Sequence, residues 1–193
     1  MARTNYIFID AENVHEKDLS RVTHKMAIVN LVLGAKQQAP SKKIDLQVRQ
    51  LGEKVGLTRA PSVGKNALDF VLTCEVGMQA AKDPDGYFHI ISKDKGFDVL
   101  VKHLKKKGIL AARRDSLAAV PALLTIEERF EKLSSDLKNP NATRPQNRKT
   151  LGSTIQQAFN RELTEEVIQR TINYLIHVRT LRILETGKVI YTY

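Results

Sequence analysis

The feature that most restricts the fold is an alternation of short apolar runs with amphipathic stretches over the first two-thirds of the chain. Apolar runs lie at residues 6–9, 27–33, 87–91 and 109–112, and a weaker one lies at residues 55–59. Runs without in/out alternation are typical of strands covered on both faces, as in parallel sheets. Helical patterns lie between them, at residues 43–54, 67–81 and 97–107. This order predicts an α/β sandwich with a mostly parallel sheet.

A change in composition near residue 138 predicts two domains. A helical pattern at residues 126–137 is expected to close the first domain, residues 1–137. Residues 138–147 hold two prolines and three asparagines without a periodic apolar residue, which predicts a linker. Residues 148–193 then show two helical patterns and a hairpin, an order that resembles the winged-helix module. The helices are expected at about 151–159 and 164–178, and the hairpin strands at 181–184 and 189–193.

The charge of the chain favours a polyanionic partner. There are 31 Lys and Arg against 21 Asp and Glu, a net charge of +10, and residues 138–193 carry half of this surplus. Nucleic acid is the commonest polyanionic partner, although a net charge of this size also serves solubility alone. No apolar stretch approaches the roughly 20 residues that span a bilayer, and a single cysteine, Cys74, excludes an intramolecular disulfide. A cytoplasmic protein without a membrane partner is therefore expected.

Three aspartates are expected to meet at the edge of the sheet where the strands end. Asp10 ends the first strand, Asp94 follows the strand at 87–91, and Asp69 lies near the start of the helix at 67–81. Ligands of open parallel sheets bind outside the carboxyl ends of the strands. Carboxylates that converge there repel one another unless a cation neutralises them, and Mg²⁺ or Mn²⁺ prefers such oxygen ligands. The pattern predicts a cation that activates a phosphodiester for hydrolysis.

Each aspartate also has a structural explanation. Asp94 is placed to cap the next helix, Asn66 and Asp69 have the spacing of a capping pair, and Asp10 can accept hydrogen bonds from loop N–H groups. Capping does not require the three side chains to meet, so their joint occurrence favours the functional interpretation. Asp98 lies one helical turn after Asp94 and can point to the same side.

Three segments resemble the PIN-like and NYN nucleases, in the order in which that family has them. They are YIFIDAENV at 6–14, GKNALDF at 64–70 and ISKDKGFD at 91–98, within a similarity that covers roughly residues 4–115. The resemblance implies a Rossmann-like PIN fold and a metal-dependent endonuclease that cleaves RNA, or less often single-stranded DNA. By position, Asp10, Asp69 and Asp94 would hold Mg²⁺ or Mn²⁺.

The resemblance also suggests residues around the metal. Asn13 and Ser92 would orient ligands or substrate. Independently of the resemblance, Lys65 and Lys93 flank two of the proposed ligands and are candidates for contacts with substrate phosphates, although exposed loop lysines are more often only solvated. Many PIN domains carry a further Asp where this chain has Gly96. Either Asp98 replaces it as the fourth catalytic metal ligand, or the site holds only one metal firmly. The rival interpretation is an inactive nucleic-acid-binding or adaptor protein, and homodimerisation is left open.

Overall fold

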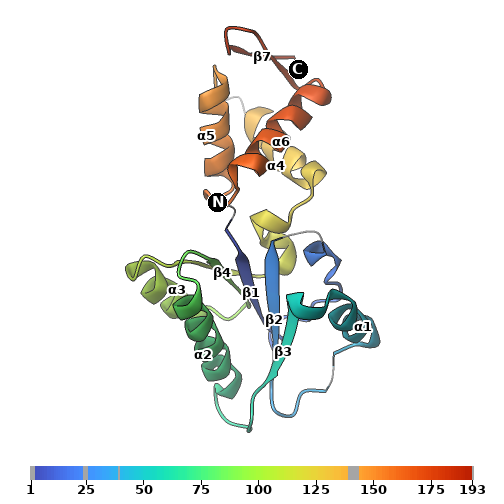
Figure 1. Cartoon of the computed structure of the whole chain (residues 1–193), viewed down its shortest axis with the longest axis vertical. Coiled ribbons are helices and arrows are strands. Elements are labelled where there is room, and N and C mark those ends of the chain that lie inside the picture. The colour runs from blue at the N-terminus through green and yellow to red at the C-terminus, as the bar shows by residue number, and fades with distance from the viewer. Residues whose placement is uncertain (1–2, 24–25, 39, 139–143, 193) are drawn as a thin grey trace. The chain divides into compact units, whose positions relative to one another are not determined.

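The computed structural model in Figure 1 describes residues 3–23, 26–38, 40–138 and 144–192. Contacts between residues divide the chain into two compact units, Met1–Leu123 and Leu124–Tyr193. The first unit contains a five-stranded parallel sheet of spatial order β3-β2-β1-β4-β5. Its strands are β1 (Asn5–Asp10), β2 (Ala27–Leu33), β3 (Val55–Arg59), β4 (Tyr87–Ile91) and β5 (Leu110–Arg114). The predicted α/β class with a parallel sheet is confirmed.

Helices cover both faces of this sheet (Figure 1). The helix α1 (Lys42–Leu51) packs on one face, and α2 (Ala67–Lys82) and α3 (Phe97–Lys106) pack on the other. The first helix was expected to reach residue 54. It ends at Leu51 because Gly52 adopts a left-handed backbone (φ +54°), and a short 3-10 turn, η2 (Gly52–Lys54), follows. Three further 3-10 turns are η1 (Ser20–Val22), η3 (Leu117–Ala119) and η4 (Pro121–Leu123).

Two apolar clusters form the core of the first unit. Fully buried Ile7, Ile9 and Ile91 belong to the cluster on the α1 face, and Phe88 and Ile90 belong to the cluster on the α2 and α3 face. Neighbouring residues of one strand therefore serve opposite faces, which explains the continuous apolar runs in the sequence.

The strand order places a topological switch point between β1 and β4. The chain proceeds outward from β1 to β2 and β3, and then returns to the other side of β1 with β4. Adjacent connections diverge at such a point and leave a crevice at the carboxyl ends of the two strands. Asp10 ends β1 and Ser92 follows β4, so both lie at this crevice.

The second unit consists of three helices followed by a hairpin. Its elements are α4 (Ile126–Lys138), α5 (Arg148–Ala158), α6 (Glu165–His177), β6 (Leu181–Ile183) and β7 (Val189–Tyr191). Side chains from all three helices and both strands share one buried cluster, centred on the fully buried Phe159. This order is compatible with a winged-helix-like module.

The position of α4 differs from the expectation that this helix closes the first domain. Its buried Leu133 belongs to the core of the second unit, and the ring of Phe130 packs edge-on against Tyr174 of α6, with centroids 5.7 Å apart. The division by contacts therefore falls at Leu123, not at residue 137. In the expected linker, residues 139–143 lie outside the described residues, and Asn147 caps α5 and pairs with Lys188 beside β7.

None of the helices in the described part of the chain has the length and apolar character needed to cross a membrane.

Candidate active site

Asp10 is a fully buried carboxylate that four protein groups hold in place. Its Oδ1 accepts hydrogen bonds from the backbone N–H groups of Glu12 (3.1 Å) and Asn13 (3.2 Å). Its Oδ2 accepts from the Asn13 side-chain amide and from the Ser92 hydroxyl, each at 2.7 Å. The structural explanation of Asp10 as an acceptor of loop N–H groups therefore holds for Oδ1. The contact with Ser92 adds a link from β1 to the segment that follows β4.

Ser92 joins Asp10 to Asp94. Its buried hydroxyl donates to Asp10 and accepts a hydrogen bond from the backbone N–H of Asp94 at 3.0 Å. Asp94 itself is exposed, and its Oδ1 accepts from the N–H of Gly96 at 2.7 Å. Because α3 begins only at Phe97 and its cap residue is Gly96, Asp94 is not the cap of that helix. The turn instead leaves the Asp94 carboxylate at the surface near the crevice.

Asp69 is the third residue of α2 and is partly buried. Asn66 has a left-handed backbone (φ 59°), and its side chain makes no capping hydrogen bond, so the expected capping pair does not form. Burial raises the pKa of Asp69, and repulsion from Asp10, Asp94 and Glu12 raises this pKa further. Since Asn66 does not cap α2, a capping pair does not explain Asp69.

These interactions define an acidic cluster of four residues, Asp10, Glu12, Asp69 and Asp94. Ser92 links Asp10 to Asp94, and Asp69 and Asp94 line one cavity. That Asp10, Asp69 and Asp94 together hold a metal stays a prediction. The charge of Glu12 also acts on Asp69, and its Oε1 lies close to Gly34, the residue after β2. The signal for Glu12 in the sequence was its position two residues after the end of a strand.

Two cavities meet at the acidic cluster. The polar cavity, of about 520 Å³, is lined by Glu12, Asn13, Lys36 and Asp69 among others. The second cavity, of about 490 Å³, lies between α2 and α3 and is lined by Asp69, Asp94 and mainly apolar side chains. Asn66 and Asp69 line both. Lys36 was not predicted, although its position just after β2 places it at the carboxyl end of the sheet.

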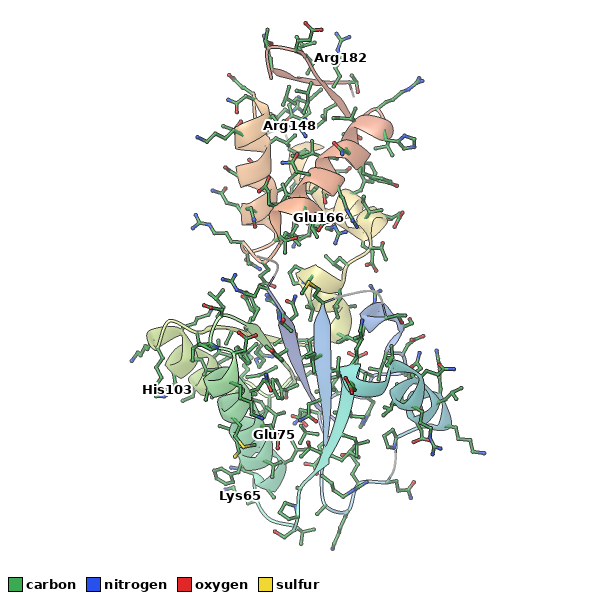
Figure 2. The ribbon with its side chains drawn as sticks, in the orientation of Figure 1. Lys65, Glu75, His103, Arg148, Glu166 and Arg182 are labelled. Atoms are coloured by element: carbon green, nitrogen blue, oxygen red, sulfur yellow. The ribbon has the colours of Figure 1, made fainter. Side chains whose placement is uncertain are left out.

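The other predicted site residues occupy different surroundings. Lys65 and Lys93 are exposed next to Asn66 and Asp94, and Figure 2 shows Lys65 at the start of α2, beside the loops that follow the strands. Asp98 forms an ion pair with Arg113 of β5 (Nε to Oδ1, 2.9 Å) and lines neither cavity. The same guanidinium donates to the carbonyl of Ser92 at 2.8 Å. A role of Asp98 as metal ligand stays a prediction.

The acidic cluster fits a hydrated divalent cation. Within the described ranges, no three His, Cys, Asp or Glu side chains are placed to hold a metal ion directly. Mg²⁺ usually keeps several waters and needs only one or two carboxylates as direct ligands. The other carboxylates of the cluster can act on the ion through these waters. The repulsion that raises the pKa of Asp69 is the unfavourable energy that a cation would relieve. Hard oxygen donors without sulfur or imidazole suit Mg²⁺ or Mn²⁺.

Comparison with known proteins gives one result. A family model described as a PIN domain matches residues 4–114, more than half of the chain. Neither a curated protein nor a solved structure matches the chain. The matched residues contain the whole sheet and all members of the acidic cluster.

Proposed function

Because this chain belongs to the PIN domain family, whose members are in general metal-dependent nucleases, we propose that it hydrolyses phosphodiester bonds of single-stranded nucleic acid, RNA in preference to DNA. The observation that carries the proposal is the placement of Asp10, Glu12 and Asp94 around Asp69 near the switch point of the sheet, where their charges raise the pKa of Asp69. A carboxylate with a shifted pKa in a cleft is a common property of catalytic sites, and Asp69 is such a residue. The resemblance to the NYN nucleases supports RNA as the preferred substrate.

Each member of the site has a proposed role. Asp94 provides an exposed carboxylate and Asp69 a partly buried one for hydrated Mg²⁺ or Mn²⁺. The buried Asp10, oriented by Ser92 and Asn13, would act on the cation through its charge. The bound cation would polarise the phosphodiester and lower the pKa of the attacking water. Lys36 of the polar cavity, together with Lys65 and Lys93, would contact substrate phosphates. Asp98 is either a further metal ligand or a residue that orients Arg113 through their ion pair.

The second unit is proposed to add affinity without reading sequence. Its exposed basic residues would contact phosphates in a salt-dependent manner. They include Arg148, Lys149, Arg182 and Lys188.

The test is cleavage of labelled single-stranded RNA and DNA in Mg²⁺ or Mn²⁺. We expect Asp69→Asn and Asp94→Asn to lower the rate on the order of 100-fold or more, because each removes a charge that holds the cation. Asp85→Asn is the matched control, since Asp85 is an exposed turn residue outside the cluster, and its rate should equal that of the wild type. Chelation of the metal should abolish cleavage.

The same assay separates the two roles of Asp98. If Asp98 serves Arg113, Asp98→Asn should lower the rate much less than Asp94→Asn, whereas equal losses would identify a metal ligand. Equal cleavage by the wild type and Asp94→Asn would reject the acidic cluster as the active site. Binding without cleavage by any of the proteins would support the inactive binding protein instead.

A further inference from the structure

An apolar groove adjoins the acidic cluster on the α2 and α3 side. Its apolar lining consists of Phe70, Phe97, Val99 and Leu100, and His103 lies at the α3 side (Figure 2). Phe70 and Val99 are 71% and 73% exposed, the largest exposures among the large hydrophobic residues of the described chain. Isolated apolar residues at a surface are common, but two such residues in one groove form an exposed apolar patch, which is typical of a binding site.

The core does not explain Phe70 or Val99. The buried positions of α2 include Leu68 and Leu72, so Phe70 lies on the opposite side of the helix, two residues from each. In α3, Phe97 and Val101 are buried, and Val99 lies between them on the outer side. An aromatic ring exposed on the outer face of a helix contributes little to folding, so a role in binding is the better explanation for Phe70.

The groove and the acidic cluster share residues. Asp69 precedes Phe70 directly in α2, and Asp69 and Asp94 line the groove at its acidic end. The polar cavity begins on the other side of Asn66 and Asp69. In a nucleic-acid strand, charged phosphates alternate with flat bases whose faces are apolar. Such a strand can place a phosphate near the carboxylates and a base in the apolar groove beside them.

We propose that the groove binds an unpaired base, the one next to the phosphate that is cleaved, by stacking it on Phe70. This inference rests on the proposed function and extends it to the part of the substrate that the enzyme recognises. Stacking on an aromatic side chain tolerates any base, because every base has a π face. A base paired within a duplex is stacked between its neighbours and cannot enter such a groove without being extruded. The groove would therefore select single-stranded segments.

A protein occupant fits the groove less well. Its rim carries Asp69 and Asp94, and a protein that covered the apolar residues would also bury these charges, which is costly without cationic partners. A nucleic acid brings the divalent cation with its phosphate, and the cation neutralises the same carboxylates. The volume of about 490 Å³ is in the range of small-ligand sites, and a single base with its sugar can occupy it.

The experiment combines variants of Phe70 with substrates that lack one base. A set of labelled single-stranded oligonucleotides, each with one abasic site at a different position, is tested for cleavage and for binding by fluorescence anisotropy. In the wild type, one abasic position next to the cleaved bond should lower kcat/KM by about 5-fold to 150-fold. Phe70→Ala should lose a similar factor on the intact strand and should no longer respond to that abasic position.

Two further variants serve as controls. Phe70→Tyr keeps an aromatic ring and should retain both the activity and the response to the abasic site. Leu46→Ala removes an exposed apolar side chain (55% exposed) from α1, on the other face of the sheet, and should behave as the wild type. Circular dichroism of Phe70→Ala should match the wild type, because the exposed ring is not part of the core.

Several outcomes would overturn the inference. If Phe70→Ala responds to the abasic site as strongly as the wild type, or cleaves the intact strand equally well, the groove does not hold the base. If sedimentation shows a wild-type dimer that Phe70→Ala dissociates, without any loss of the abasic response, the groove binds a second copy of the chain. Cleavage that depends on Asp94 but not on Phe70 would retain the nuclease and reject the groove. Binding that depends on Phe70 and on one base, without cleavage, would retain the groove and reject the nuclease.

Discussion

At the scale of single residues, the site contains carboxylates in contrasting surroundings. Asp10 is buried and accepts four hydrogen bonds, so its orientation is fixed by Ser92, Asn13 and the loop backbone. Asp69 has partial burial and like-charged neighbours, which disfavour its ionised form and raise its pKa. A cation at the cluster would reverse this effect for Asp69, because an adjacent positive charge stabilises the carboxylate.

A buried histidine makes the stability of the first unit dependent on pH. His89 of β4 is fully buried, its Nε2 hydrogen-bonds with Asn5 (3.0 Å), and its Nδ1 has no partner among the described residues. Burial, and then the charge of Arg114, lower the pKa of His89 from 6.5 to about 3. The unfolded chain binds a proton between these pH values and the folded chain does not. Stability is therefore complete above pH 6.5 and falls as the pH drops toward 3.

The prediction is a loss of about 2 kcal/mol of unfolding free energy from this residue between pH 7.5 and pH 5. Urea unfolding of the wild type and of His89→Gln at both pH values measures it. His89→Gln removes the titrating group, so its unfolding midpoint should change less with pH than that of the wild type. The same pH dependence in both proteins would show that His89 is not the cause.

At the scale of elements, the loops after β1 and β2 fit together at a glycine. A Cβ added at Gly34 would lie 1.7 Å from Oε1 of Glu12, which is the flexible end of a side chain and can move. We expect Gly34→Ala to fold normally and to displace the Glu12 carboxylate from the acidic cluster. Because the three atoms nearest to that Cβ all belong to Glu12, the substitution should act through Glu12 alone.

Cleavage kinetics and thermal unfolding test this coupling. If Glu12 helps to hold the cation, Gly34→Ala and Glu12→Gln should both raise the Mg²⁺ concentration needed for half-maximal cleavage, with little change in melting temperature. The double variant should then be no worse than Glu12→Gln. Additive losses would show that Gly34 acts by another route.

At the scale of the whole molecule, the division at Leu123 predicts which fragments fold. A chain that ends at residue 123 contains the complete sheet and its two apolar clusters. A chain that ends at residue 137 also carries α4, whose Leu133 would lose the core of the second unit to which it belongs. We expect the shorter fragment to remain monomeric and to unfold cooperatively, and the longer one to expose apolar surface.

Binding of a fluorescent apolar dye and sedimentation distinguish the two fragments. The shorter fragment should retain metal-dependent cleavage, and its binding to single-stranded RNA should depend less steeply on salt than that of the full chain, because the basic second unit is missing. A longer fragment that is better behaved than the shorter one would contradict the boundary at Leu123. An unchanged salt dependence would reject the proposed phosphate contacts of the second unit.

Local sequence patterns were sufficient to predict the class of the fold and the order of its elements. Apolar runs such as residues 87–91 predicted buried parallel strands, because local periodicity reflects burial on both faces. The same reasoning predicted that Asp10, Asp69 and Asp94 lie close together, since residues that follow parallel strands share one edge. It did not predict the partner of α4, because an amphipathic helix shows only that one face is buried and not against which core.

The contacts of individual side chains, in contrast, depend on the folded chain. Asp98 lies one turn after Asp94, but its ion-pair partner is Arg113 of β5. A pattern in the sequence around Asp98 does not show that β5 lies beside it. Asn66 and Asp69 have the spacing of a capping pair, yet the left-handed backbone of Asn66 prevents the cap and leaves Asp69 to its charged neighbours. The exposure of Phe70 in a groove between α2 and α3 depends on how two helices pack. Local sequence determines which elements form, whereas contacts between distant residues depend on packing that only the folded chain specifies.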